Sequence, residues 1–189
     1  MTGDLYLLYP LNEFYALSGL PMPNAAEIAG EEMPEPYRSL LVHARDMTPT
    51  LEGFYKQGIH VRILKRHLSE SVYARQVVLA LDGDERPVEF GAIQIYLEHL
   101  PSKARELILE GKQPLGAILH NQGIGHASCP KAFFRINSDA VIDSALHLTG
   151  LNLLYGRRNV LLNSLERTLA EIVEILPPLA HERPLDESQ

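Results

Sequence analysis

The most constraining feature of this 189-residue sequence is a change in the spacing of its hydrophobic residues after Gly58. From residue 36 to that glycine, apolar side chains recur every three or four positions, which predicts an amphipathic helix or a pair of helices. Beyond it, the runs IHVRIL and VYARQVVLALDGDERPVEFGAIQIYL are β-rich and largely alternate with a period of two, and Asp82-Gly83 is typical of a hairpin turn. This part of the chain is therefore expected to form three neighbouring antiparallel strands.

The rest of the chain mixes helical and strand patterns. The expected elements are helices over 101–110 and 114–120, a strand in AFFRIN, a turn or helix over 138–148, and strands near 155–163 and 169–176. Runs of strands with helices inserted between them indicate an α+β fold around a mostly antiparallel sheet. We expect one domain over residues 37–178, preceded by an irregular or helical arm (1–36) and followed by a polar tail (179–189).

The formal net charge of −7 argues against a nucleic-acid surface, because phosphate binding needs a clustered basic face. Cys129 is the only cysteine, so no internal disulfide can form, and the N-terminus lacks the pattern of a secretory signal. No apolar run approaches the roughly 20 residues that span a bilayer. These features predict a cytoplasmic protein that binds neither nucleic acid nor membrane.

Arg75 lies inside the second β-rich run. Strand alternation places it on the same face as Tyr73, Val77 and Leu79. A guanidinium keeps its proton, so a buried one needs an anion, either a protein carboxylate or a ligand. A structural ion pair and an arginine at the wet end of the strand both remain open interpretations.

The motif LYGRRN places two adjacent arginines between apolar runs. If a strand begins near Tyr155, alternation puts Arg158 with Val160 and Arg157 with Asn159. Arg158 is then expected to face the core and Arg157 the more polar face. The alternative is a surface bend with both arginines in water.

Two glutamates, Glu171 and Glu174, fall in the last predicted strand. Both faces of that strand are apolar, so spacing does not decide which glutamate points inward. Burial would raise the pKa of an interior glutamate and a nearby arginine would lower it. Such a group suits acid–base chemistry or recognition of a hydroxyl, although it can equally be a structural partner.

Familiar cofactor and nucleophile motifs are absent from the sequence. The eight histidines show no spacing suited to zinc, GIGHAS is an incomplete dinucleotide fingerprint, and GKQPLG is not a phosphate loop. No GxSxG elbow occurs, and Cys129 has no motif around it. We therefore expect no metal and no cofactor.

Five motifs in order resemble the chorismate pyruvate-lyase (4-hydroxybenzoate synthase) family, and most closely its branch with LYGRRN and AEIVEILPP. They are DMT (46–48), VYARQVVLALDGDERPVEF (72–90), GKQPLG (111–116), LYGRRN (154–159) and EIVEILPP (171–178). The likeness runs from about residue 40 to 178. It implies a six-stranded antiparallel sheet with flanking helices that enclose the product, and a reaction without cofactor that converts chorismate to 4-hydroxybenzoate and pyruvate.

The resemblance also implies roles for particular residues. Arg75 would hold the ring carboxylate, Met47 and Leu115 would line the ring, and Glu174 would meet the ring hydroxyl. Glu171 stands close enough in the sequence to be the alternative for that last role.

Chorismate carries a second carboxylate, on the enolpyruvyl ether, for which Arg158 or Arg157 is the expected partner. Holding both ends of the substrate would make elimination unimolecular. The rival hypothesis is a non-catalytic effector-sensing domain that binds a small aromatic carboxylate, as in bacterial transcription regulators, although residues 1–40 offer no basic recognition helix.

Overall fold

A single antiparallel sheet organises the computed structural model, which describes residues 6–179. Its strands are Ala25–Ile28 (β1), Ile59–Ser69 (β2), Val72–Leu81 (β3), Pro87–Tyr96 (β4), His126–Asn137 (β5), Leu153–Asn163 (β6) and Thr168–Leu176 (β7). Their order across the sheet is β1-β5-β6-β7-β4-β3-β2. The predicted α+β class with one antiparallel sheet is confirmed.

The sheet has seven strands where six were expected. The additional strand is β1, which lies in the N-terminal segment predicted to be an irregular or helical arm. Its residues pair with Phe133–Ile136 of β5 and so extend the sheet at one edge. Of the tail predicted for residues 179–189, all but Leu179 lies outside the described residues.

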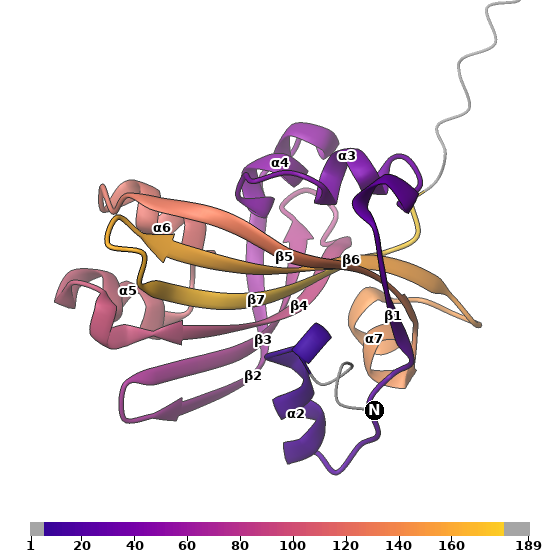
Figure 1. The fold of residues 1–189 in the computed structure, drawn as a ribbon, viewed down its shortest axis with the longest axis horizontal. Coiled ribbons are helices and arrows are strands. Elements are labelled where there is room, and N and C mark those ends of the chain that lie inside the picture. The colour runs from indigo at the N-terminus through magenta and orange to yellow at the C-terminus, as the bar shows by residue number, and fades with distance from the viewer. Residues whose placement is uncertain (1–5, 180–189) are drawn as a thin grey trace, which may run out of the picture.

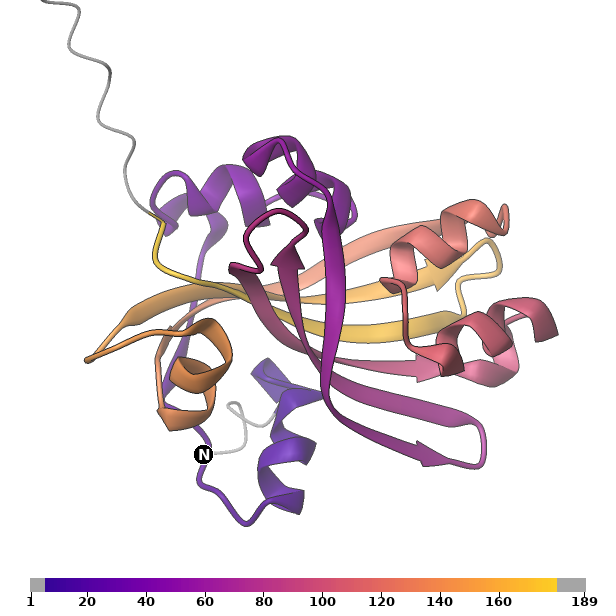
Figure 2. The same ribbon diagram turned by 180° about the vertical axis from the view of Figure 1, so that it is seen from behind.

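Helices cover both faces of this sheet. They are Leu11–Leu17 (α2), Tyr37–Leu41 (α3), Met47–Tyr55 (α4), Ser102–Glu110 (α5), Leu115–Asn121 (α6) and Ala140–Leu146 (α7), with short 3-10 turns at Gly30–Glu32 and Leu97–His99. Figures 1 and 2 show α3 and α4 on one side of the sheet, α2 and α7 on the other, and α5 and α6 near one end. The predicted helix pair before the first long strand is thus present as α3 and α4.

The pleat of β3 defines two faces of the sheet. Tyr73, Arg75 and Val77 point to what we call the first face, and Ala74 and Val78 point to the second face. Helices α5 and α6 pack on the first face at one end, and α3 and α4 pack on it at the other end. The second face is covered by α2 and α7.

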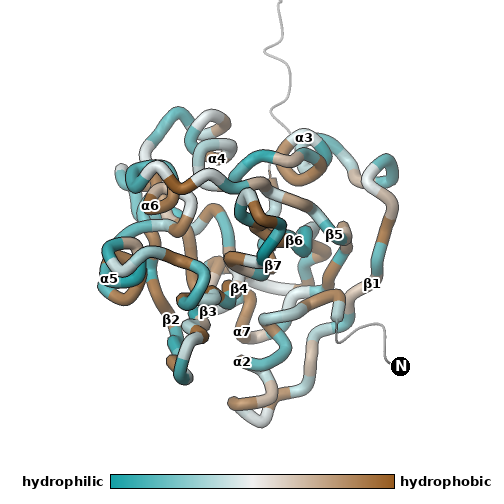
Figure 3. Tube along the Cα trace, turned by 60° about the vertical axis from the view of Figure 1, so that its left-hand side comes forward, coloured by the Kyte–Doolittle hydropathy of each residue, from teal (hydrophilic) through white to brown (hydrophobic). Residues whose placement is uncertain are grey.

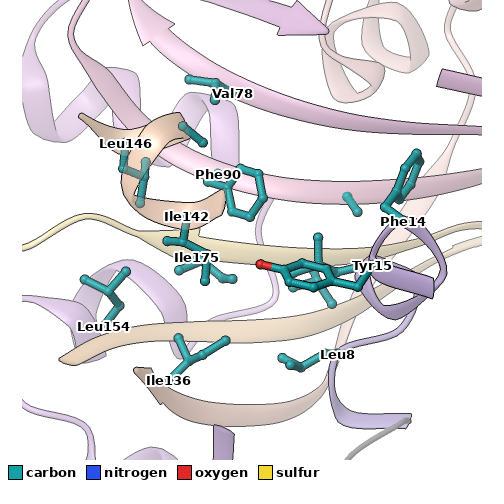
Figure 4. Packing of buried hydrophobic residues seen from close by; sticks show 14 of the residues in the cluster. Leu8, Phe14, Tyr15, Val78, Phe90, Ile136, Ile142, Leu146, Leu154 and Ile175 are labelled. Atoms are coloured by element: carbon teal, nitrogen blue, oxygen red, sulfur yellow. The ribbon is translucent and has the colours of Figure 1, made fainter. Parts of the chain in front are cut away.

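The second face holds a continuous hydrophobic core, which Figure 4 shows from close by. Phe90 and Ile175 project from the sheet toward Ile142 of α7 and Tyr15 of α2. The Tyr15 hydroxyl donates a hydrogen bond of 3.0 Å to Asp139, the residue whose carboxylate caps α7. The two helices are therefore joined over this core by a buried phenol as well as by apolar contact.

The first face is divided into two hydrophobic clusters. One lies under α5 and α6, and the other lies under α3 and α4. Buried polar side chains of the central strands occupy the same face as these clusters. They are Arg75, Glu89, Arg157, Asn159 and Glu174. Hydrophilic stretches within β6 and β7 are visible in Figure 3.

Some elements differ in extent from the sequence-based expectation. Helix α4 ends where Lys56 adopts a left-handed conformation, two residues before the glycine expected to stop it. Strand β5 begins at His126, well before AFFRIN, and accommodates Pro130 beside a register shift. The segment after it forms the helix α7, because Asp139 caps its first turn.

Candidate functional site

A cavity opens on the first face, between the sheet and the starts of α4 and α6. The centre of a water molecule can occupy a volume of about 70 Å³ within it. A single water needs roughly 10–15 Å³ on this measure, so the cavity has room for several waters. Most residues that line it are apolar, and its charged residues are Asp46, Arg75, Glu89 and Glu174. The lining includes Asp46, Met47, Val61, Arg75, Val77, Leu79, Glu89, Ile93, Leu115, Asn159, Leu161, Ile172 and Glu174.

Arg75 is the cation of this cavity and is only 2% exposed. Its Nη2 donates a hydrogen bond of 3.2 Å to the carbonyl of Gln113, whereas Nε and Nη1 have no partner among residues 6–179. Burial lowers the pKa of Arg75, and the Tyr73 hydroxyl nearby opposes that shift. No protein carboxylate neutralises this guanidinium within the described part of the chain, so the group is available to an anionic ligand.

Glu174 lines the cavity from β7 and is held by Arg157 of β6. The Arg157 Nε donates to Glu174 Oε2, and both side chains are buried. Arg157 also donates to the carbonyls of Leu41 at 3.2 Å, His43 at 2.9 Å and Arg45 at 3.1 Å. This arginine therefore fixes the loop between α3 and α4 to the sheet, and with it the start of α4.

The imidazole of His43 belongs to the same network. Its Nδ1 lies 3.3 Å from Arg157 Nη1. Burial, followed by the charges of Arg157 and Arg45, lowers the pKa of His43, so the neutral ring is favoured and Nδ1 accepts the hydrogen bond.

The two arginines of LYGRRN face in the opposite sense to the expectation. Arg157 is the fully buried one, while Arg158 lies on the second face and bonds Glu171 at 2.9 Å. Alternation failed here because helices cover both faces, so apolar neighbours such as Val160 and Leu161 are buried on either side. The assignment of Arg158 to the core and Arg157 to the polar face was wrong.

The cavity is lined by none of the three residues Arg157, Arg158 and Glu171. Glu171 is engaged on the second face, where it accepts hydrogen bonds from Arg158 and from the Tyr96 hydroxyl at 2.9 Å. The structure therefore separates Glu171 and Arg158 from Arg75 and Glu174, which share the first face.

Met47 and Leu115 stand at the first positions of α4 and α6, and both line the cavity. The residues before them, Asp46 and Pro114, make no side-chain capping bond. The first N–H groups of a helix have no partner within the helix, so these backbone groups can bind oxygen atoms of a ligand. The four residues Met47, Arg75, Leu115 and Glu174 are thus brought to one cavity.

The Asp46 carboxylate also joins the edge of the cavity to the far end of the sheet. His126 Nε2 lies 2.8 Å from Asp46 Oδ2, and its Nδ1 lies 3.2 Å from the carbonyl of Ile124. Both Asp46 and His126 are mostly shielded from solvent. This contact ties the start of α4 to the start of β5.

Glu89 is a site residue that our sequence analysis missed. It lies on β4, is 5% exposed, lines the cavity, and has one oxygen, Oε2, with no partner in the part of the chain described. The signal was the same as for Arg75, namely a charged residue within a β-rich run, VEFGAIQI. Asn159 was also not proposed as a site residue, and its amide donates to Ser128 at 2.9 Å beside the cavity.

Residues 6–179 contain neither a metal-binding cluster nor a membrane-spanning helix. No three His, Cys, Asp or Glu side chains converge there in a way that could hold a metal ion. None of the helices in this range is both long and apolar enough to traverse a bilayer.

No protein-family model and no curated protein matches the sequence. Among solved structures, the chain is similar to the effector domain of PhnF from Mycobacterium smegmatis, with a TM-score of 0.52 and 12% identity over 69% of this chain and 87% of that one. The structure of PhnF from the same organism gives a TM-score of 0.50 and 12% identity, covering 92% and 99% of the two chains. The possible transcriptional regulator YydK from Bacillus subtilis gives 0.50 and 6%, covering 63% and 58%.

At these identities the comparisons show the fold alone. The chain is an α+β domain with the chorismate lyase-like fold, a seven-stranded antiparallel sheet with flanking helices. The effector domain of PhnF shares this fold.

Proposed function

We propose that the cavity binds a small aromatic carboxylate and that the protein eliminates pyruvate from chorismate to leave 4-hydroxybenzoate. One observation carries the proposal. Arg75 is a buried cation with two unpaired donor atoms inside a cavity, and carboxyl groups stand at the other end of that cavity. A ligand with an anion at one end and an oxygen at the other complements this arrangement.

The strand register supports the fit to a ring substituted at opposite ends. Arg75 pairs with Ile93 of β4, which pairs with Ile172 of β7, and Glu174 lies two residues further along that strand. Strand spacing and rise place the Cα atoms of Arg75 and Glu174 about 12 Å apart. Their long side chains reduce that span, which leaves room for an aromatic ring between the two charged groups.

Each group then has a chemical role in the elimination. Arg75 binds the ring carboxylate and fixes the ring. Glu174, kept in place by Arg157, lies beside the ring carbon C4 and accepts the proton that C4 loses, while the C3–O bond to the enolpyruvyl group breaks. The backbone N–H groups of Met47 and Leu115 bind oxygens of the substrate. Aromatisation of the ring drives the reaction, so orientation in a closed cavity supplies most of what the protein must contribute.

The enolpyruvyl carboxylate is not assigned to Arg157 or Arg158 in this proposal. Arg157 is occupied by Glu174 and three carbonyl groups, and Arg158 is on the second face.

The test is to incubate the purified protein with chorismate and to measure pyruvate and 4-hydroxybenzoate separately. Equal release of the two products is expected. Arg75→Met should abolish turnover, whereas Arg135→Met, which changes an exposed arginine of β5, should not. Undiminished turnover by Arg75→Met would overturn the site assignment.

A second candidate is a non-catalytic domain that senses an aromatic carboxylate. The comparisons favour it, because effector domains of regulators share this fold. It predicts that 4-hydroxybenzoate or a related acid binds and depends on Arg75, while chorismate is recovered unchanged. Calorimetry with the acid, run beside the turnover assay, separates the two functions.

A further inference from the structure

Glu89 is a buried carboxyl group of the cavity to which the proposed elimination assigns no role. It comes from the central strand β4, and its Oε2 has no hydrogen-bond partner within residues 6–179. A buried carboxyl group without a partner destabilises a fold, and an apolar side chain would fit this position at lower cost. Its presence therefore calls for a role in the cavity that it lines.

The register places Glu89 next to Glu174. Gly91 is directly opposite Glu174 in the β4–β7 ladder, and Glu89 is two residues from Gly91 on the same face. Such diagonal neighbours lie roughly 7–8 Å apart, and their Cβ atoms are somewhat closer. Both carboxyl groups thus stand at the same end of the cavity, away from Arg75, and Gly91 leaves the space between them unfilled by a side chain.

The surroundings of the two glutamates differ. Glu174 accepts a hydrogen bond from Arg157 and forms an ion pair with it. Glu89 has no such partner. Burial raises the pKa of Glu89 well above the ordinary range, the charge of Glu174 raises it further, and Arg157 only partly offsets these effects. The other charged groups around the cavity are Arg75 on β3 and Asp46 at the start of α4. Two neighbouring carboxyl groups, one paired with an arginine and the other without a partner among residues 6–179, are an arrangement suited to acid–base catalysis.

We propose that Glu89 is the proton donor of the elimination, the general acid that complements Glu174 as the base. This assignment rests on the proposed function, because it presumes that chorismate is the substrate. With the ring carboxylate on Arg75, the adjacent ring carbons C4 and C3 lie at the end of the cavity where the two neighbouring carboxyl groups stand.

In the proposed elimination, Glu174 takes the proton from C4, and the electrons of that C–H bond form the new ring double bond. The C3–O bond breaks, its electron pair goes to the leaving oxygen, and Glu89 gives that oxygen its proton. The enol of pyruvate leaves and tautomerises to pyruvate. The proton on Glu174 then passes to Glu89, so no proton is gained or lost overall.

The decisive variant is Glu89→Gln, which keeps the size and a hydrogen-bond donor but removes the transferable proton. Single-turnover rates are measured with chorismate so that product release does not limit the reaction. We expect the rate to fall about 100-fold, with KM and the affinity for 4-hydroxybenzoate nearly unchanged. Glu27→Gln, on the exposed face of β1, is the matched control and should keep the full rate.

A purely structural role predicts a different pattern, since glutamine would replace glutamate without loss of rate. A full rate for Glu89→Gln in an active protein would overturn the assignment of the acid and leave the lyase function standing. If the wild-type protein releases no pyruvate, the proposed function fails, and the acid role fails with it. If Glu89→Gln does not fold, the pH dependence of the wild-type single-turnover rate decides. The rate should fall on the alkaline side as Glu89 ionises, and a flat alkaline limb would overturn the proposal.

Discussion

Arg157 and Glu174 face each other across β6 and β7 and form an ion pair that is almost fully removed from water. The remaining donors of Arg157 reach the backbone carbonyls of the loop before α4. The Arg157 side chain thus connects Glu174 of the cavity with the loop that leads into α4. Its neighbour in sequence, Arg158, bonds Glu171 on the second face instead.

Replacing Arg157 by Met should destabilise the protein strongly, because Glu174 is then left buried without its partner. We expect the free energy of unfolding to fall by about 3–5 kcal/mol in chemical denaturation. Arg158→Met is the internal control. Its pair with Glu171 is partly exposed, at 20% and 17% of the two side chains, so the expected loss is about 1 kcal/mol or less. Equal losses for the two variants would contradict the network described for Arg157.

Replacing Arg75 by Met should make the ligand-free protein more stable. The substitution removes a buried charge with two unpaired donor atoms, and the free energy of unfolding should rise by about 1–3 kcal/mol. The same variant should bind 4-hydroxybenzoate about 10- to 100-fold more weakly, because the charged hydrogen bonds to the carboxylate are lost. Thermal melting and calorimetry measure the two effects. A variant that is both less stable and unchanged in binding would show that Arg75 is a structural residue.

Glu89 should make the stability depend on pH in a predictable direction. Its pKa is raised in the folded protein by burial and by Glu174, so the folded state holds a proton that the unfolded chain releases. Stability is therefore greatest below the ordinary glutamate pKa and is lost as the pH rises toward the folded-state pKa. Glu89→Gln has no proton to lose at this position. Its free energy of unfolding minus that of the wild type should increase as the pH rises from the ordinary glutamate pKa into the alkaline range. A difference that stays constant over this range would mean that Glu89 titrates alike in both states.

Gly91 should tolerate no side chain. A Cβ atom at this position would lie 2.1 Å from the carbonyl oxygen of Val173 in the neighbouring strand, so the backbone would have to shift. We expect Gly91→Ala to lower the free energy of unfolding by about 3 kcal/mol. Gly53→Ala is a useful comparison, since no atom lies within 4 Å of its added Cβ on helix α4. That substitution should raise the free energy of unfolding by about 0.5–1 kcal/mol. A decrease for Gly53→Ala would mean that the loss measured for Gly91→Ala is not specific to the clash at Gly91.

Local sequence patterns were sufficient to predict a strand wherever hydrophobic alternation was strong. The β-rich runs identified β2, β3 and β4, and the turn at Asp82-Gly83 marked the hairpin between the last two. Alternation along β3 placed Arg75 on the same face as Val77 and Leu79, where it lines the cavity. The short pairing of β1 was not visible, because four residues of an edge strand carry too little pattern to distinguish them from a loop.

The same patterns failed where burial on both faces removed the contrast that they rely on. Arg157 and Arg158 lie between apolar residues on both sides, and helices cover both sides of their strand, so alternation alone could not orient them. Glu171 and Glu174 posed the same problem, and only the ladder between β6 and β7 separates them by pairing Arg157 with Glu174.

The order of residues along the chain by itself determined the α+β class, the strands with strong alternation and the face of its strand on which Arg75 lies. Only the tertiary structure decided that Arg75 and Arg157 are buried, that Glu174 and not Glu171 lines the cavity, and that Glu89 stands beside Glu174. The reason is that these relationships depend on strand register and on which helices cover each face. Both are set by contacts between segments far apart in the chain, which no local spacing records.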